Sequence, residues 1–252
     1  MSARRWAWRA GSVLVCIALV LAWQAVADAR LVSPVFLPPP DKVWRALQRG
    51  MASGVLLQKL GGTVLRMIEG WAVASLLGVG LGTLVGASHT ARAWLGPTLE
   101  FLRPLPASAI IPVAIALFGL SDAMVLGVIG FGALWPMLLA TVHGFAAVEP
   151  RLYEVSRALG LSRAAVVWKV ALPSALPDIL AGARLGLTVA LVLAGVCEML
   201  AGRDGLGQWI LLSARSFRAP DLYAGVVLFG VLGYASALLI GAVERRALRW
   251  RG

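Results

Sequence analysis

The sequence predicts an all-α membrane protein, folded as a bundle of six transmembrane helices. Apolar residues make up 60% of the 252-residue chain and its mean hydropathy is +0.84, whereas a soluble domain is about half apolar. Charged residues contribute only 14% and cluster between long uncharged runs. Six of these runs approach the length of about 20 residues that a helix needs to cross a bilayer. A soluble globular fold is therefore excluded.

The first of the six expected spans could be mistaken for a secretory signal peptide. The spans cover residues 8–27, 64–87, 105–120, 124–142, 179–201 and 222–243. A basic start with Arg4, Arg5 and Arg9 precedes the first span, as in a signal peptide. Because its apolar stretch is nearly long enough to cross the membrane, we expect this segment to stay in the protein as a span and not to be cleaved off.

The connection at residues 28–63 is expected to lie outside the membrane and to hold one short helix. Three consecutive prolines at 38–40 stop the preceding helix. Asp41 can then cap a helix, whose apolar face would consist of Val43, Trp44, Leu47 and Met51. Such an amphipathic helix lies in the membrane interface or on the bundle.

The second span carries Gly78, Gly82 and Gly86 at intervals of four residues. This spacing places small residues on one helix face, which lets another helix approach closely. Near the start of the same span, Arg66 and Glu69 are one turn apart. We expect these two residues to neutralise each other as an ion pair.

Three residues are candidates for the wall of a translocation path: Pro106, Pro112 and Glu198. Proline kinks a helix, and carbonyls freed within a membrane face protein or a wet cavity. A kinked helix with a purely structural role is an equal alternative for the two prolines. Glu198 is an ionisable residue near the end of the fifth span, and such residues face a cavity or a partner. For Glu198 we favour a structural or gating role over contact with a solute.

The distribution of basic residues predicts a cytoplasmic N-terminus. Lys and Arg are then more numerous in the connections on the inside, as the positive-inside rule requires. The bias is incomplete because the first outer connection is also basic, with Lys42, Arg45, Arg49 and Lys59. Six spans place both termini and the connection after the fourth span in the cytoplasm.

The polar connection after the fourth span has the pattern of two short helices joined at a glycine. Pro150 suits the first turn of a helix, and Leu152, Val155 and Leu159 recur on one face of it. Gly160 can adopt the left-handed conformation that ends a helix. Such a helix can dock into the groove of a partner or lie on the membrane surface.

The second helix of this connection has its own start and stop signals. Ser162 can cap it, and Val166, Val167 and Val170 give it an apolar side. Leu172-Pro173 is expected to close it. Pro177 is expected to turn the chain into the fifth span.

This connection resembles the EAA loop in the permease subunits of bacterial ABC importers. Glu154-Val155-Ser156 is followed after three residues by Gly160, and after nine more by Val170-x-Leu172-Pro173. The loop has the same spacing between its E-A-A, G and I-x-L-P elements. Val155, Ser156 and Val170 depart from the commonest residues of the loop.

The similarity extends over about residues 60–245 and is to permeases of the nitrate, sulfonate and taurine type. Their R-P-x-P, I-P, F-G, E-M and G-L-G patterns resemble five segments here: Arg103-Pro104-Leu105-Pro106, Ile111-Pro112, Phe118-Gly119, Glu198-Met199 and Gly205-Leu206-Gly207. The resemblance implies a six-helix bundle of the type I ABC importer permease kind, with cytoplasmic coupling helices between spans 4 and 5. It divides the chain into a first span and outer loop (1–62), a permease core with the coupling loop at 149–173 (63–245), and a cytoplasmic tail (246–252).

The resemblance also implies partners and a function. The ATPase would contact Glu154, Val155, Ser156, Arg157, Gly160, Leu161, Leu172 and Pro173. The assembly would contain two ABC ATPase subunits, a second and identical permease, and an extracytoplasmic solute-binding protein. It would lie among the lipids of the bacterial inner membrane and import a small solute such as an aliphatic sulfonate, taurine or nitrate.

The chain is expected to be a non-catalytic subunit without a cofactor of its own. A phosphate-binding loop needs Gly-Lys-Ser/Thr, and none of Lys42, Lys59 and Lys169 follows a glycine. ATP and Mg²⁺ would therefore be bound by the partner ATPase. Cys16 and Cys197 lie in apolar runs, so no metal site is expected. The net charge of +11 reflects arginines that flank spans rather than a nucleic-acid surface.

Other functions remain open at this point. An ABC permease for another cargo, such as a thiamine-precursor pyrimidine, riboflavin or amino acids, is the main alternative, because the loop indicates the ATPase partner and not the transported solute. A secondary transporter would show repeated halves and midplane charges. A membrane enzyme would need a Ser/His pair or paired aspartates within the spans. Neither of the last two patterns is evident.

Overall fold

A computed structural model describes residues 2–102 and 104–249, which form helices and turns without a β-strand. The elements in chain order are α1 (Ser2–Asp28), α2 (Pro40–Ala52), α3 (Val55–Gly86), α4 (His89–Leu102), the 3₁₀ turn η1 (Ala107–Ile110), α5 (Ile111–Phe118), α6 (Asp122–Ala146), α7 (Pro150–Ala158), α8 (Arg163–Val166), the π-helical turn η2 (Val167–Ala171), α9 (Leu172–Ala201), α10 (Leu206–Arg215) and α11 (Ala219–Ala247).

The predicted helical bundle is confirmed. Among the described residues, five stretches are long and apolar enough to cross a membrane: α1, α3, α6, the continuous helix α8–η2–α9, and α11. A sixth span is reached if α4 and the η1–α5 segment, which are bent by 79° relative to each other, count as one broken span.

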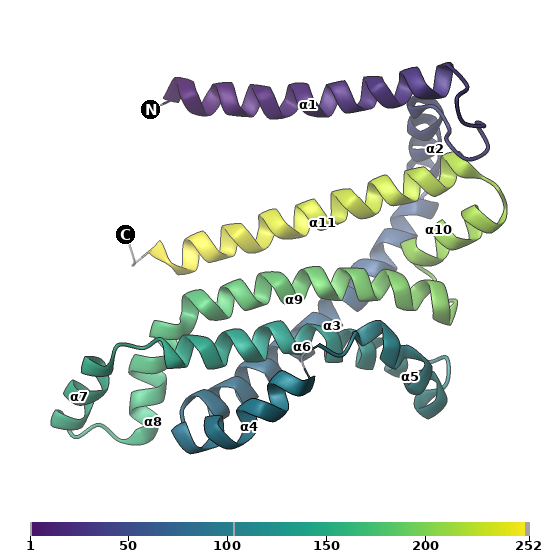
Figure 1. The fold of residues 1–252 in the computed structure, drawn as a ribbon. Helices are drawn as coiled ribbons and strands as arrows, with labels where there is room; N and C mark the ends of the chain where they lie inside the picture. The colour runs from purple at the N-terminus through teal and green to yellow at the C-terminus, as the bar shows by residue number, and fades with distance from the viewer. Residues whose placement is uncertain (1, 103, 250–252) are drawn as a thin grey trace.

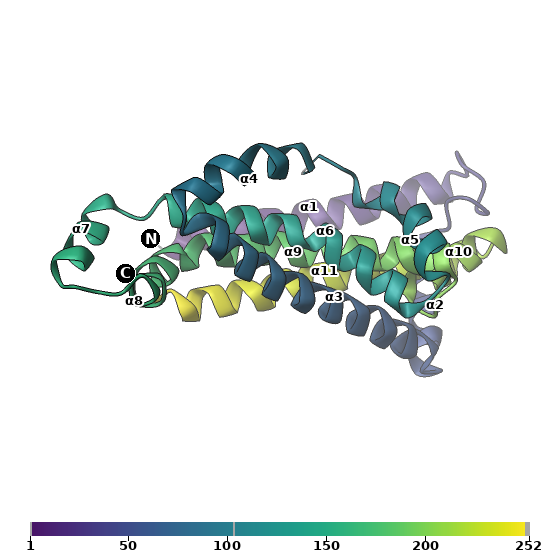
Figure 2. The same ribbon diagram turned by 90° about the horizontal axis from the view of Figure 1, so that it is seen from below.

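The two ends of the bundle hold different elements. The start of α1, the end of α11 and the α7–α8 connection lie at one end, whereas α2, α5 and α10 lie at the other (Figure 1, Figure 2). We refer to these as the α7 end and the α10 end. Both terminal helices therefore share the end that carries the connection after α6, as an even number of spans requires.

The core is formed where α6 packs against α3 and α9. The glycine line predicted on α3 lies in this contact. A Cβ atom on Gly78 would lie 2.6 Å from Cβ of Met137, and one on Gly82 would lie 2.6 Å from Cβ of Thr141. These distances are too short for any side chain, so the close approach of α3 and α6 depends on glycine.

We expect Gly82→Ala to destabilise the protein and Gly80→Ala to leave its stability unchanged or slightly raised. A Cβ at Gly82 would collide with α6, whereas one at Gly80 would meet nothing within 4 Å. Overpacking of a core costs about 1–3 kcal/mol, while alanine favours a helix by up to about 1 kcal/mol over glycine. Thermal unfolding of the two variants in detergent measures the difference. Equal melting temperatures would contradict the packing described above.

The third span differs from its prediction. Pro112 lies in the first turn of α5, where the missing N–H removes no helical hydrogen bond, so it does not kink the span. The chain bends instead between Leu102 and Ala107, a stretch with Pro104 and Pro106. Arg103 of the R-P-x-P segment lies outside the described residues.

Pro177 does not turn the chain between two helices, and Leu172-Pro173 begins α9 within a helix that continues from α8, rather than closing one. α9 runs through Pro177, and α8 joins it through the π-helical turn. A Cβ on Gly144 of α6 would lie 2.8 Å from Cβ of Ala175 and 3.0 Å from Cβ of Asp178. This packing on both sides of Pro177 retains the helix although proline removes one hydrogen bond.

Helices α3 and α2 also differ from expectation. α3 begins at Val55 rather than at residue 64, and its 32 residues extend over about 48 Å, beyond a hydrocarbon layer of about 30 Å. The expected domain limits at 62 and 246 therefore lie inside α3 and α11. Pro39, not Asp41, occupies the cap position of α2. Trp44 is 59% exposed and lies off the buried face, which contains Val43.

Candidate functional site

The connection between α6 and α9 has the predicted helix–glycine–helix shape. Gly160 adopts a φ of +65°, which ends α7 in the left-handed conformation. The backbone N–H of Leu161 donates to the carbonyl of Ser156 at 3.0 Å. Ser162 caps α8, because its Oγ accepts the N–H of Ala165 at 3.3 Å. The predicted helix end at Gly160 and the predicted cap at Ser162 are thus confirmed.

An apolar ridge runs along α7 and is not covered by the bundle. Leu152, Val155 and Leu159 are 40%, 55% and 71% exposed. Figure 2 shows α7 beyond the end of the bundle, away from the packed spans. A contiguous apolar surface with a polar rim is typical of a protein-interaction site.

The eight residues expected to contact an ATPase fall into three groups by exposure. Those with exposed side chains or backbone are Glu154, Val155, Arg157, Gly160 and Pro173, whereas Leu161 and Leu172 are half-buried. Ser156 is buried, and its Oγ donates to the carbonyl of Leu152 at 2.6 Å. Ser156 therefore faces its own chain, and the exposed group forms the outer surface.

Tyr153 anchors α7 to the bundle and was not singled out by the sequence analysis. It packs against the main core, and its hydroxyl donates to the carbonyl of Phe145 at 3.4 Å. Burial raises the pKa of Tyr153, partly offset by the positive charge of Arg92, so the hydroxyl stays protonated at neutral pH. The available signal was an aromatic residue on the face of α7 opposite the ridge.

A cavity of 1120 Å³ lies between α4, η1, α6 and α9. Its wall is mostly apolar, with six polar or charged residues among its lining: Arg92, Glu100, Ser108, His143, Asp178 and Thr188. Trp135 also lines it, and its buried indole N–H has no acceptor among the described residues. Pro106 lies between two lining residues, Leu105 and Ala107. The side chains of Pro106, Pro112 and Glu198 do not themselves line the cavity.

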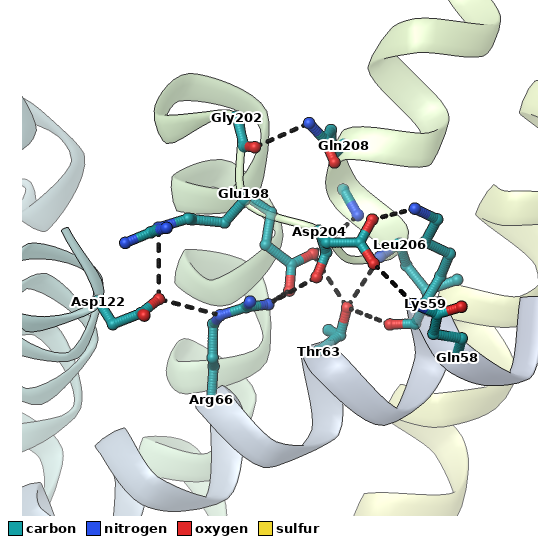
Figure 3. Close-up of polar contacts among 12 residues, drawn as sticks. Gln58, Lys59, Thr63, Arg66, Asp122, Glu198, Gly202, Asp204, Leu206 and Gln208 are labelled. Atoms are coloured by element: carbon teal, nitrogen blue, oxygen red, sulfur yellow. Dashed lines mark hydrogen bonds and ion pairs between the residues drawn. The ribbon is translucent and has the colours of Figure 1, made fainter. Parts of the chain in front are cut away.

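Glu198 lies instead in a polar network at the α10 end (Figure 3). Its fully buried carboxylate accepts three hydrogen bonds. Thr63 Oγ1 donates to it at 2.9 Å, the backbone N–H of Gly207 at 2.9 Å, and Arg66 at 3.1 Å. Because a buried charge must be paired and hydrogen-bonded, these contacts account for the carboxylate at this depth.

Arg66 pairs with Glu198 and not with Glu69, so the predicted pair is wrong. Glu69 is exposed and gains little from an ion pair in water, whereas the buried carboxylate requires a cation. Arg66 also donates to the carbonyl of Asp204 at 2.9 Å and lies 3.9 Å from Asp122 on α6. The network therefore joins α3, α6, α9 and the start of α10.

The Gly205-Leu206-Gly207 segment fits closely against this network. A Cβ on Gly205 would overlap the Glu198 carboxylate, and one on Gly207 would overlap the carbonyl of Gly195. The N–H of Leu206 donates to Thr63 Oγ1 at 2.9 Å. The two glycines therefore let α10 begin directly beside α9.

Comparison with known proteins finds relatives of this chain among transport proteins. The family described as "Binding-protein-dependent transport system inner membrane component" matches residues 52–249. The taurine transport system permease protein TauC of Escherichia coli K12 is 33% identical, over 93% of this chain and 87% of that protein. The putative aliphatic sulfonates transport permease protein SsuC of Bacillus subtilis 168 is 31% identical, over 98% of this chain and 90% of that protein.

Solved structures share the fold. A chain of the MetNI methionine ABC transporter, in an inward-facing conformation, matches with a TM-score of 0.67 and 19% identity, over 76% of this chain and 95% of that one. A chain of an amino acid ABC transporter matches with a TM-score of 0.65 and 17% identity, over 79% and 97%.

Proposed function

Because this chain belongs to the family of inner membrane components of binding-protein-dependent transport systems, we propose that it imports a small solute of the sulfonate type. The chain is the membrane-spanning permease of an ABC importer. Its likeness to permeases named for taurine and for aliphatic sulfonates supports the cargo. A permease named for bicarbonate is also similar, at 25% identity, so an inorganic anion is the second candidate.

The observation that supports the transport role best is the exposed ridge on α7, at the end of the bundle where both terminal helices lie. We propose that this end is cytoplasmic and that Glu154, Val155, Arg157 and Gly160 meet an ATPase subunit there. An amphipathic helix that presents anchors at helical spacing fits a groove in a partner. The missing Gly-Lys-Ser/Thr sequence makes a separate ATPase necessary, and that subunit would bind ATP and Mg²⁺.

The full importer would contain two ATPase subunits, two copies of this chain and an extracytoplasmic binding protein. Closed, symmetric pairs are the commonest oligomers. The apolar stretch Gly11–Asp28 of α1 is only 6% buried, which leaves ample surface for lipid and for a second permease.

A movement of the ATPase can be transmitted to the wall of the cavity through one helix. α8, η2 and α9 form one continuous helix over Arg163–Ala201, and Asp178 and Thr188 of α9 line the cavity. We propose that closure of the ATPase pair draws the two loops together and that α9 moves with α8. The cavity then opens alternately to the two sides, which requires different contacts with the ATPase in each state.

Within this mechanism, the Glu198 network would hold the α10 end together while the α7 end moves. Glu198 is buried within its own chain and does not line the cavity, which supports a structural role rather than contact with the solute. Pro106, between two lining residues, stays a candidate for the path, and Pro112 would act through the position of α5.

Uptake in proteoliposomes tests the proposed function. Vesicles with this chain, its ATPase and its binding protein should accumulate taurine or an alkanesulfonate only when ATP is present on the ATPase side. Competing bicarbonate, amino acids, riboflavin and a thiamine-precursor pyrimidine would identify another cargo. Uptake that follows an ion gradient without ATP would contradict the proposal in favour of a secondary transporter.

A further inference from the structure

A second hollow, of 520 Å³, lies at the α10 end between α2 and the start of α11. It is lined by Lys42, Arg45, Gln48, Arg49 and Pro220. Three of these five residues are basic, so the hollow presents positive charge to whatever occupies it. The opposite face of α2 packs on α11, where Val43 and Ala46 meet Ala224. This packing holds the basic residues on the outer side of α2.

Most of this positive charge is uncompensated. Arg45 pairs with Asp41, one turn away, at 2.5 Å. Among residues 2–102 and 104–249, no carboxylate oxygen lies within 4.0 Å of the charged groups of Lys42 or Arg49. Two cations therefore share one hollow without a counter-ion from the described chain.

The hollow lies at the level where the spans end. α2 begins at Pro40, shortly after α1 ends at Asp28, and α3 begins at Val55, directly after α2. Beside these ends, the rings of Trp23 and Tyr223 pack with centroids 5.6 Å apart. Trp and Tyr gather at the interface between membrane and water, and the 59% exposed Trp44 on α2 fits the same level.

Exposed apolar residues lie in the turn that precedes α2. In the turn between α1 and α2, Leu31 and Phe36 are 74% and 65% exposed. The hydroxyl of Tyr223 donates to the carbonyl of Phe36 at 3.1 Å, which fixes this turn beside α11. Basic residues next to exposed apolar ones suit a membrane interface, where acyl chains cover the apolar part and phosphates meet the cations.

We propose that this hollow binds the headgroup of an anionic phospholipid, with Lys42 and Arg49 as the main contacts to the phosphate. The acyl chains would lie against the turn at Leu31 and Phe36. The positive-inside rule gives no reason for a basic α10 end, because in the proposed orientation this end is extracytoplasmic. A bound anionic lipid supplies that reason, and it would tie α2 and α11 to the outer leaflet.

Native mass spectrometry of the full chain in detergent, titrated with phosphatidylglycerol, tests the site. A basic residue near an anionic surface strengthens binding by about 1 kcal/mol, or roughly fivefold, so the double variant K42Q/R49Q should bind about 25-fold more weakly. The control variant R215Q removes one positive charge from an exposed position at the same end, outside both the hollow and the turn at Leu31. It should bind like the wild type, and K42R/R49K should retain most of the affinity.

Three results would overturn the proposal. One is equal retention of phosphatidylglycerol and zwitterionic phosphatidylcholine. Another is full displacement by glycerol 3-phosphate at equal concentration, which would assign the hollow to a free anion. The third is an unchanged lipid titration in K42Q/R49Q together with lost capture of the cognate binding protein, which would assign it to protein docking. Because the titration needs neither ATP nor cargo, its outcome is independent of the uptake assay.

Discussion

Replacement of Gly160 by valine is expected to reduce solute uptake at least tenfold while ATP hydrolysis continues. Gly160 has a φ of +65°, a conformation that costs an L-residue about 1–2 kcal/mol and that β-branched residues adopt only rarely. A Cβ there meets nothing within 4 Å, so the variant acts through the backbone and not through a collision. Relief of this strain would rotate α7 relative to α8 and misplace the apolar ridge. Solute uptake and ATP hydrolysis are measured in the same proteoliposomes, and the ratio of uptake to hydrolysis should fall in the variant.

Gly54 provides a matched control for this variant. It also has a positive φ, of +76°, with open space around its Cβ position, but it lies at the other end of the bundle, before α3. Gly54→Val should introduce comparable strain and leave the ratio of uptake to hydrolysis unchanged. If both variants lose coupling equally, the loop at Gly160 has no special role.

The largest effect on stability is expected from Glu198→Ala. This change leaves the guanidinium of Arg66, the hydroxyl of Thr63 and the N–H of Gly207 without their common acceptor. Removal of one partner from a buried ion pair costs about 3–5 kcal/mol. Because native stabilities are themselves about 5–15 kcal/mol, we expect a large fall in the thermal unfolding temperature of the purified chain.

Two further variants distinguish loss of the Glu198 network from a general effect of removing a negative charge near Arg66. Glu69→Ala removes an exposed carboxylate one turn from Arg66 and should leave the unfolding temperature unchanged. Glu198→Gln keeps the shape but loses the charge and one acceptor, and its effect should fall between those of the other two. A large destabilisation by Glu69→Ala would restore the ion pair that the sequence predicted.

The features predicted correctly from the sequence depend on neighbours along the chain. Apolar runs of membrane length identified the bundle of spans, helical periodicity identified the ridge on α7, and the spacing of glycines on α3 identified its packing face. Gly160 acts through its own backbone conformation, and Ser162 through a hydrogen bond between its side chain and a residue three positions later, so both roles could be predicted from the local sequence.

The features that the sequence did not reveal depend on distant contacts. The partner of Arg66 is 132 residues away, and only the fold shows that Glu198 is buried beside it. Pro177 has the local signature of a helix end, but packing of α6 on both sides of it keeps α9 continuous. For Tyr153 the sequence offered only an aromatic residue off the ridge of α7, and the contact with Phe145 in the fold identifies it as an anchor.

Cross-linking at position 157 tests the central claim, which is that the ATPase subunit binds the permease at the α7–α8 connection. Cys16 is exposed and would first be replaced by serine, after which Arg157→Cys and, as a control at the α10 end, Arg215→Cys are each combined with the ATPase. A short thiol cross-linker should join position 157 to the ATPase, with a yield that changes when ATP is added, and should leave position 215 unlinked. No cross-link at 157 under any nucleotide condition, or equal yields at the two positions, would contradict the account.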